Sequence, residues 1–172
     1  FQHVNLAVGT RAPMASPGTM TQTSHDLQMQ HHLIDTLYSE AMLLADEARD
    51  YFDETGRTDR EALDPAIRVS FSCESLKVTT RLMHAIAWFL TQRAVRAGEL
   101  SARDALEPSR RLGEAPSTEQ ALIDVLPSQA RKLVQASIDL HRRVARLDLA
   151  QDPVETITSP ALSMQHRLAT VF

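Results

Sequence analysis

The residues that could carry out catalysis are few and lie far apart along the chain. Cys73, the single cysteine, could serve as a nucleophile only with a histidine and an orienting group beside it in space. His84 and His141 fall in different predicted helices, and neither has sequence neighbours that define a catalytic arrangement. We therefore predict that Cys73 is a small core or boundary residue and that the protein is not an enzyme.

Metal and phosphate sites are not indicated either. His31 and His32 are adjacent, which on a helix turns them about 100° apart, so the two rings do not face one metal ion. His31 and Asp35 could share a face, but we favour a solvated pair, and no Glu has the His three residues later that helical di-metal sites use. Phosphate-binding loops need clustered glycines, whereas Gly56, Gly98 and Gly113 stand alone at apparent helix ends. We expect no cofactor and no metal.

Charge is distributed unevenly in a chain of net charge −4. Residues 25–56 contain eight acidic residues and one Arg, and residues 65–98 contain five basic residues and one acidic residue, so two such helices could pack side by side. The last helical segment is basic. Its modest patch, without helix-turn-helix spacing, disfavours nucleic acid as a partner but leaves a DNA-associated regulator as an alternative. The basic residues are Arg131, Lys132, Arg142, Arg143 and Arg146.

Three long segments have apolar residues every three or four positions, which predicts three helices. The first begins at an N-cap, Ser24, and ends at Gly56, where we expect a positive φ. The second opens at Pro65 and stops at Gly98, and the third spans residues 128–150. No stretch sustains the alternation of a strand, so we predict an all-α fold, a three-helix bundle.

The three helices define one domain, residues 24–150, between two flexible segments. Residues 1–23 lack periodicity, and we interpret them as a leader or a cloning remnant. Pro and Gly interrupt residues 101–127, which predicts a short helical and loop insertion before the third helix. Residues 151–172 are expected to form a flexible tail. No apolar run approaches the ~20 residues that cross a bilayer, and we expect a cytoplasmic protein.

The second helix has two apolar rows on one side and a polar stripe opposite them. At 100° per residue, the stripe occupies an arc of ~80°, so Trp88 should point away from the core. An outward Trp among basic residues favours a docking or self-association surface; a loop or the tail covering Trp88 is the alternative. One row contains Phe71, Val78, Leu82, Ile86 and Phe89, the other Leu76, Thr79, Met83, Leu90 and Ala94, and the stripe Glu74, Lys77, Arg81, His84, Trp88, Gln92 and Val95.

Two segments resemble a known family. They read LIDTLYSEAMLLADEARDYFD over residues 33–53 and FSCESLKVTTRLMHAIAWFLTQRAVRAGE over residues 71–99. Both closely resemble the alphaproteobacterial DUF1465 family, which includes the RcdA-type regulators of CtrA degradation, and the most specific parts are ESL, TTRLM and QRAV in the second segment. The resemblance implies a three-helix bundle that acts as an adaptor and brings substrates to the ClpXP protease.

Together these features predict a non-enzymatic adaptor in which the bundle supplies a rigid surface and the tail a second, tethered contact. The expected partners are the ClpXP machinery and protein cargo, and a homodimer is left open. Alternatives are a helical interaction protein with unrelated cargo, the DNA-associated regulator, and an enzyme with a cryptic tertiary site. The predicted partner-binding residues are Glu74, Lys77, Arg81, His84, Trp88, Gln92 and Arg93 in the second helix and Leu168, Val171 and Phe172 in the tail.

Overall fold

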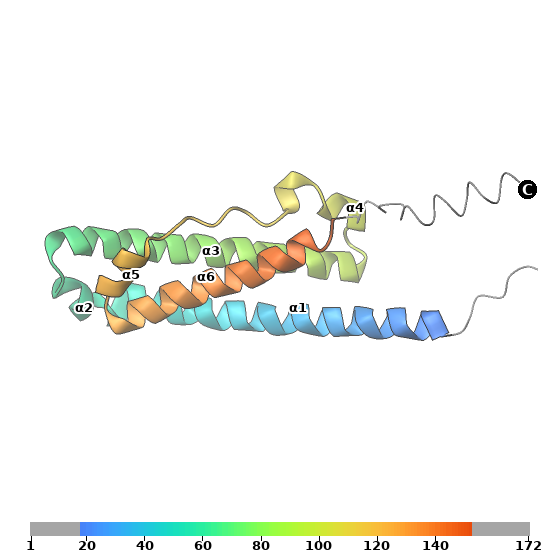
Figure 1. Ribbon diagram of the computed structural model, residues 1–172, viewed down its shortest axis with the longest axis horizontal. Coiled ribbons are helices and arrows are strands. Elements are labelled where there is room, and N and C mark those ends of the chain that lie inside the picture. The colour runs from blue at the N-terminus through green and yellow to red at the C-terminus, as the bar shows by residue number, and fades with distance from the viewer. Residues whose placement is uncertain (1–17, 153–172) are drawn as a thin grey trace, which may run out of the picture. The chain divides into compact units, whose positions relative to one another are not determined.

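A computed structural model describes residues 18–152, with side chains from residue 25 onward, and every regular element in this range is helical (Figure 1). The all-α prediction is confirmed. Two compact units divide the chain after Leu33, and the bundle lies in the second unit, which begins at Ile34. The elements are α1 (Gly18–Asp50), a π-helical turn (Tyr51–Thr55), α2 (Arg57–Glu61), α3 (Pro65–Ala97), α4 (Ala102–Ala105), a 3-10 turn (Pro108–Arg110), α5 (Gln120–Val125) and α6 (Ser128–Leu149).

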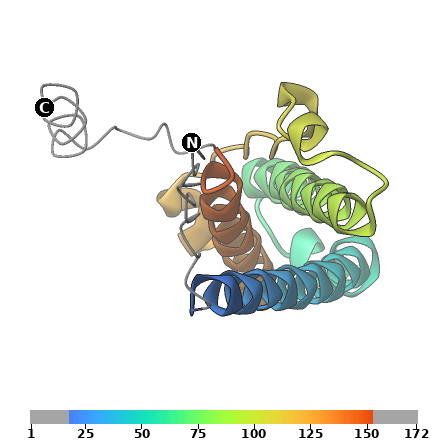
Figure 2. The same cartoon turned by 90° about the vertical axis from the view of Figure 1, so that its right-hand side faces the viewer.

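Apolar residues at helical spacing on α1, α3 and α6 form one core. Helices stabilise each other when such a face is removed from water, and each long helix contributes one here. In Figure 1, α6 runs obliquely between α1 and α3, and Figures 1 and 2 both show the connection after α4 passing along α3 on the side away from α1. Core members include Ile34, Leu37, Ala41 and Leu44 of α1, Phe71, Val78, Leu82 and Phe89 of α3, and Leu133, Val134, Leu140 and Val144 of α6.

The helix ends follow the sequence signals in part. Gly98 ends α3 with φ 75°, and the Ser101 side chain accepts a hydrogen bond from the Asp104 amide at 3.0 Å, so both signals are confirmed. The predicted positive φ at Gly56 is wrong, because its φ is −82°. A β-carbon there would lie 2.6 Å from the Tyr51 carbonyl oxygen, so this glycine permits a close backbone approach at the end of the π-helical turn.

Two other predictions from sequence also need correction. The first helix begins at Gly18, within the segment interpreted as a leader, so Ser24 is not its N-cap. Cys73 is exposed rather than a core or boundary residue. Both errors arise because a periodic pattern shows which residues share a face, but not where a helix frays or which face is covered.

Candidate protein-docking surface

The polar stripe predicted to face outward on α3 lies largely inside the protein. Trp88 is only 2% exposed, and its indole N–H donates a hydrogen bond to Asp148 Oδ1 of α6 at 2.7 Å. Arg111 donates to the same oxygen through Nε at 2.9 Å, to the Asp148 carbonyl oxygen through Nη2 at 3.0 Å, and pairs with Asp152 through Nη1. Two donors therefore converge on one buried carboxylate, which allows the indole to be covered without an unsatisfied polar group. The prediction that Trp88 points outward is wrong, and it binds within its own chain.

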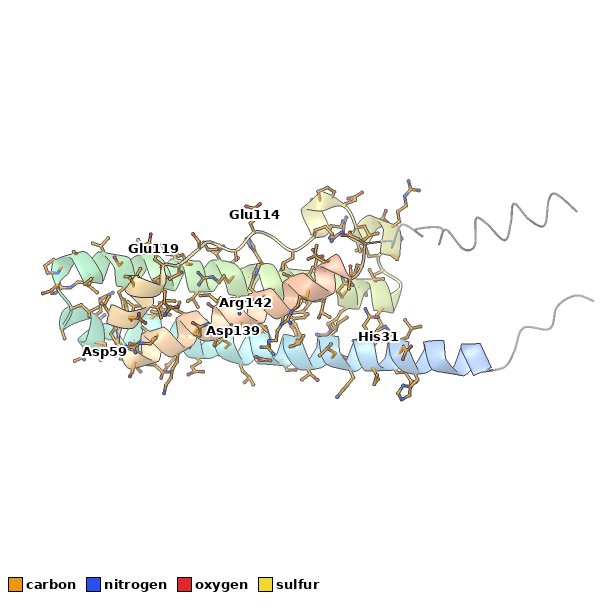
Figure 3. All side chains as sticks on the ribbon, viewed as in Figure 1. His31, Asp59, Glu114, Glu119, Asp139 and Arg142 are labelled. Atoms are coloured by element: carbon orange, nitrogen blue, oxygen red, sulfur yellow. The ribbon has the colours of Figure 1, made fainter. Side chains whose placement is uncertain are left out.

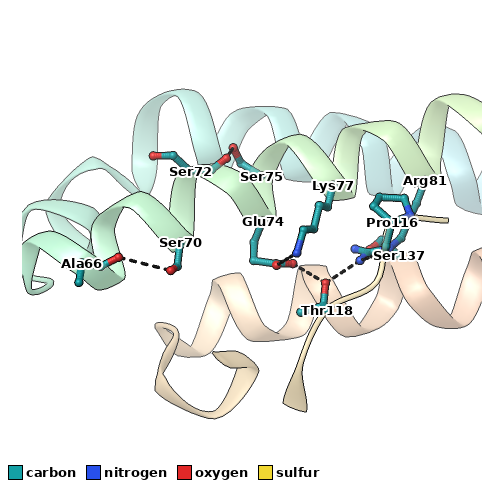
Figure 4. Close-up of polar contacts among 10 residues, drawn as sticks. All are labelled: Ala66, Ser70, Ser72, Glu74, Ser75, Lys77, Arg81, Pro116, Thr118 and Ser137. Atoms are coloured by element: carbon teal, nitrogen blue, oxygen red, sulfur yellow. Dashed lines mark hydrogen bonds and ion pairs between the residues drawn. The ribbon is translucent and has the colours of Figure 1, made fainter. Parts of the chain in front are cut away.

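Glu74 and Arg81 are also buried, and they meet through a threonine that sequence reasoning did not single out. The Thr118 hydroxyl donates to Glu74 Oε2 at 2.7 Å and accepts from Arg81 Nη2 at 2.7 Å (Figure 4). Arg81 also donates to the Pro116 carbonyl oxygen at 2.7 Å and to Ser137 Oγ of α6 at 3.2 Å.

This network satisfies two charges that would otherwise be costly to bury. Burial lowers the pKa of Arg81, while the Glu74 carboxylate acts in the opposite direction, and a guanidinium stays protonated at any physiological pH. Lys77 donates to Glu74 Oε1 at 2.7 Å and completes the set of donors around that carboxylate. Glu74 and Arg81 thus fasten the connection between α4 and α5 onto α3, and we call residues 111–119 of this connection the strap.

Two histidines hold the upstream part of the strap. His84 of α3 lies 3.1 Å from the Glu114 carbonyl oxygen through Nδ1, and His141 of α6 lies 2.9 Å from the Gly113 carbonyl oxygen through Nε2. A β-carbon on Gly113 would sit 2.6 Å from the His84 ring, so glycine is required where the strap passes so close to α3. Burial lowers the pKa of His141, the hydrogen bond to the Gly113 carbonyl raises it, and the neighbouring His84 and Arg81 lower it, with a net lowering. Both histidines thus contact the strap backbone at its upstream end.

The remaining predicted binding residues are placed in different surroundings. The Gln92 side chain donates to the Gln151 side chain at 3.3 Å, just beyond the end of α6. The guanidinium of Arg93 lies 4.7 Å from the Tyr38 ring centroid and remains partly exposed. Leu168, Val171 and Phe172 lie outside the described residues. Their binding role stays a prediction.

The basic residues of α6 are partly neutralised by the bundle. Arg143 pairs with Glu40 of α1, and Arg142 donates to Asp139 at 2.9 Å, a pair labelled in Figure 3. Arg131 donates to the Leu126 carbonyl oxygen at 3.2 Å and so covers the turn that leads into α6. Arg142 and Arg143 therefore have carboxylate partners. The carbonyl oxygen that binds Arg131 leaves its charge uncompensated, and Lys132 and Arg146 are exposed, so the nucleic-acid alternative stays a prediction.

The other apolar row of α3 is exposed, contrary to its predicted place in the core. Leu76, Met83 and Leu90 are 68%, 64% and 49% exposed, and they recur every seven residues along α3. The predicted orientation of α3 about its own axis is therefore wrong. The row expected to contact a second neighbour is uncovered, and the stripe expected in solvent contacts α6 and the strap.

Part of this exposed row forms one wall of a hollow between α1 and α3. Its floor includes Ala48 and Leu82, and Ala45 and Phe52 form the opposite wall. Arg49 and Asp53, 3.9 Å apart, stand at its polar rim. We call this hollow the α1–α3 groove. A separate hollow further along α3 is lined by Leu90, Arg93 and Ala94.

The α1–α3 groove is the surface in the described part of the chain best suited to receive another protein segment. It combines exposed apolar side chains with polar residues at the edge, which is the arrangement of helix-binding grooves. Its sequence signal was the apolar row of the second predicted helix that contains Leu76 and Met83. The pattern was visible, but the assignment of a covering neighbour was incorrect.

Other kinds of site find little support among residues 25–152. No group of three or more His, Cys, Asp or Glu side chains there could hold a metal ion. Nor does any helix within the described range have the length and apolar character needed to span a membrane. The described part of the chain is a small helical domain whose distinctive surface is apolar and elongated.

This domain belongs to the DUF1465 family. The family model, described as a protein of unknown function, matches residues 25–172. Among solved structures, RcdA from Caulobacter crescentus CB15 is similar, with 35% sequence identity and a TM-score of 0.56 over 69% of this chain and 90% of that chain. Among curated proteins no match was found. The family prediction made from the 33–53 and 71–99 segments is confirmed.

Proposed function

We propose that this protein is a non-enzymatic adaptor that binds regulatory proteins in the cytoplasm and delivers them to the ClpXP protease. The observation that carries the proposal is the similarity to RcdA, which extends over 90% of that chain. Within the family, the RcdA-type members are those for which the resemblance implies delivery of substrates to a protease. An adaptor needs surfaces for binding rather than a catalytic cleft, and the described residues offer such a surface in the α1–α3 groove.

The groove supports this proposal through its shape and composition. Leu76 and Met83 present apolar side chains that cost free energy while they are in contact with water, at about 25 cal/mol per Å² of apolar area. A partner helix with apolar residues at i, i+3 and i+7 would cover this row. The strap and α6 pack on the other side of α3, so partner docking need not disturb the buried polar network.

Delivery also requires a second contact, and the tail is suited to provide it. Leu168, Val171 and Phe172 are apolar residues in a segment too short to form a core of its own. A tethered contact acts at an effective concentration on the order of millimolar, so two weak contacts can hold cargo and protease together. We propose that the bundle binds one partner and that the tail reaches the other.

Capture of partners with an inactive protease tests this function. The full chain would be immobilised with ClpX and a proteolytically inactive ClpP in lysate, and the captured proteins would then be offered to active ClpXP with and without this chain. The proposal predicts at least one captured protein whose degradation becomes about tenfold faster when the adaptor is present. If every captured protein is degraded at the same rate with and without the chain, the adaptor function is incorrect.

A further inference from the structure

The exposed apolar row of α3, which forms one wall of the α1–α3 groove and extends beyond it, has the length of a short helix. Leu76 and Leu90 are fourteen residues apart on α3, which corresponds to about 21 Å at 1.5 Å per residue. Across the groove, Ala45 of α1 and Phe52 of the π-helical turn are seven residues apart in sequence, the same spacing as Leu76 and Met83. The bundle therefore has room for a fourth helix beside α1 and α3. A helix that docks there needs a narrow apolar face about thirteen residues long.

The last residues of this chain have the sequence of such a helix. Ser159 followed by Pro160 matches the sequence pattern of an N-cap and a first helical residue, because Pro is tolerated at that position. On a helical wheel, five of the seven apolar residues that follow fall within an arc of about 100°, and Leu162 and Ala169 fall outside it. Ser163, His166 and Thr170 lie on the opposite side of the same helical wheel. The apolar arc contains Ala161, Met164, Leu168, Val171 and Phe172.

A helix over residues 160–172 would be about 20 Å long, which matches the exposed row from Leu76 to Leu90. The described end of the chain is also close enough for this segment to reach it. Gln151 contacts Gln92 and Asp152 contacts Arg111, so the chain leaves α6 beside the last turns of α3, near the level of Leu90. Residues 153–158 can span up to about 20 Å, and half the circumference of a helix is about 16 Å. Six residues are therefore enough to pass around α3 into the groove.

We propose that residues 159–172 dock as an amphipathic helix in the α1–α3 groove of their own chain and leave it when a partner binds there. The docking itself rests on the groove and the tail sequence, whereas the displacement by a partner rests on the function proposed above. Because the tether holds the tail at a millimolar effective concentration, an intrinsic Kd of about 100 μM would keep the groove about nine-tenths occupied. The apparent affinity of a competing partner would then fall about tenfold.

A fluorescent peptide of residues 157–172 added to the full chain tests the docking. Leu168→Asp in the chain places a charge on the apolar arc and should free the groove, so the peptide should bind this variant about tenfold more tightly than it binds the unaltered chain. Thr170→Asp adds the same charge on the opposite side and should leave the affinity unchanged. Adding Met83→Asp to the Leu168→Asp chain should abolish binding, with thermal unfolding confirming that this exposed site does not affect the fold.

Methionine methyl NMR on the unaltered chain distinguishes docking within one chain from exchange between copies. We expect a nuclear Overhauser contact between the Met83 and Met164 methyl groups that persists on dilution. A contact seen only between differently labelled chains would assign the groove to a second copy and overturn the proposal. So would equal peptide affinity for the unaltered and Leu168→Asp chains. The docking and the adaptor function can fail separately, because cargo degradation by ClpXP is measured independently of peptide binding.

Discussion

The two sides of α3 differ in a way that hydropathy alone does not anticipate. One side carries Glu74, Arg81 and Trp88, and all three are buried with hydrogen-bond partners on the strap or α6. The other side carries Leu76 and Met83, which are exposed along the α1–α3 groove. Burial follows the availability of partners and covering elements as well as polarity, so a polar row can be internal and an apolar row can be a docking surface.

The largest expected effect comes from truncating the indole on the buried side. Trp88→Ala should lower the free energy of unfolding by about 3–5 kcal/mol, because it opens a cavity and removes one of two donors to Asp148. Chemical denaturation followed by circular dichroism measures this loss. Leu76→Ala is the matched control on the exposed side and should change stability by less than about 0.5 kcal/mol. Similar losses in both variants would contradict the assignment of the two sides.

A smaller effect is expected at the threonine that joins the buried charges. Thr118→Val keeps the side-chain shape but removes the hydroxyl between Glu74 and Arg81, and it should cost about 1–3 kcal/mol. Hydrogen exchange should also show faster opening of the strap. Ser117→Ala, at an exposed neighbouring residue, is the control. If Thr118→Val is as stable as the control, the network does not fasten the strap.

Truncating a side chain at the edge of the groove should lower the free energy of unfolding less than truncating one in the closed core. Ile86 is only partly buried and lines the groove, so Ile86→Ala should cost about 1 kcal/mol, below the ~2–5 kcal/mol of a fully buried site. The denaturation midpoint measures the difference, and Val78→Ala serves as the fully buried comparison. A loss for Ile86→Ala as large as that for Val78→Ala would mean that the groove is closed at this position.

The burial of His141 between α6 and the strap predicts a mild dependence of stability on pH. Because burial lowers the pKa of His141, the unfolded chain takes up a proton more readily than the folded chain. The contribution of neutral His141 to stability should therefore be fully present above pH ~6.5. It should decline as the pH falls through the pKa of this histidine in the unfolded chain and then through its lower pKa in the folded chain. Thermal unfolding between pH 7.5 and 5.5 checks the direction, and His141→Gln should flatten the profile. A profile that is unchanged by this substitution would assign the dependence to other groups.

Much of the architecture was predictable because it depends on local chemistry. Gly98 and Pro65 mark the ends of α3, and Ser101 caps α4 through its own side chain, all within a few residues of sequence. The family was also recognisable, since the 71–99 segment is distinctive.

The orientation of α3 was not predictable, because it depends on a distant segment. Arg81 is buried by Pro116 and Thr118, thirty-five and thirty-seven residues later, and Trp88 by Asp148, sixty residues later. An arc calculated on one helix cannot show which neighbour brings a hydrogen-bond acceptor. The sequence did allow that a loop could cover Trp88, and its hydrogen-bond partner is Asp148 of α6, which also accepts from the strap residue Arg111.

The affinity of a captured cargo protein for two single-charge variants tests the central claim most directly. Met83→Asp alters the exposed row in the groove, and Leu43→Asp alters an equally exposed apolar residue of α1 that does not line it. Both should leave stability nearly unchanged. Our account predicts that Met83→Asp weakens cargo binding at least tenfold, about 1.4 kcal/mol, while Leu43→Asp changes it less than twofold. Equal affinities for the two variants, or a loss confined to Leu43→Asp, would contradict the assignment of the groove as the docking surface.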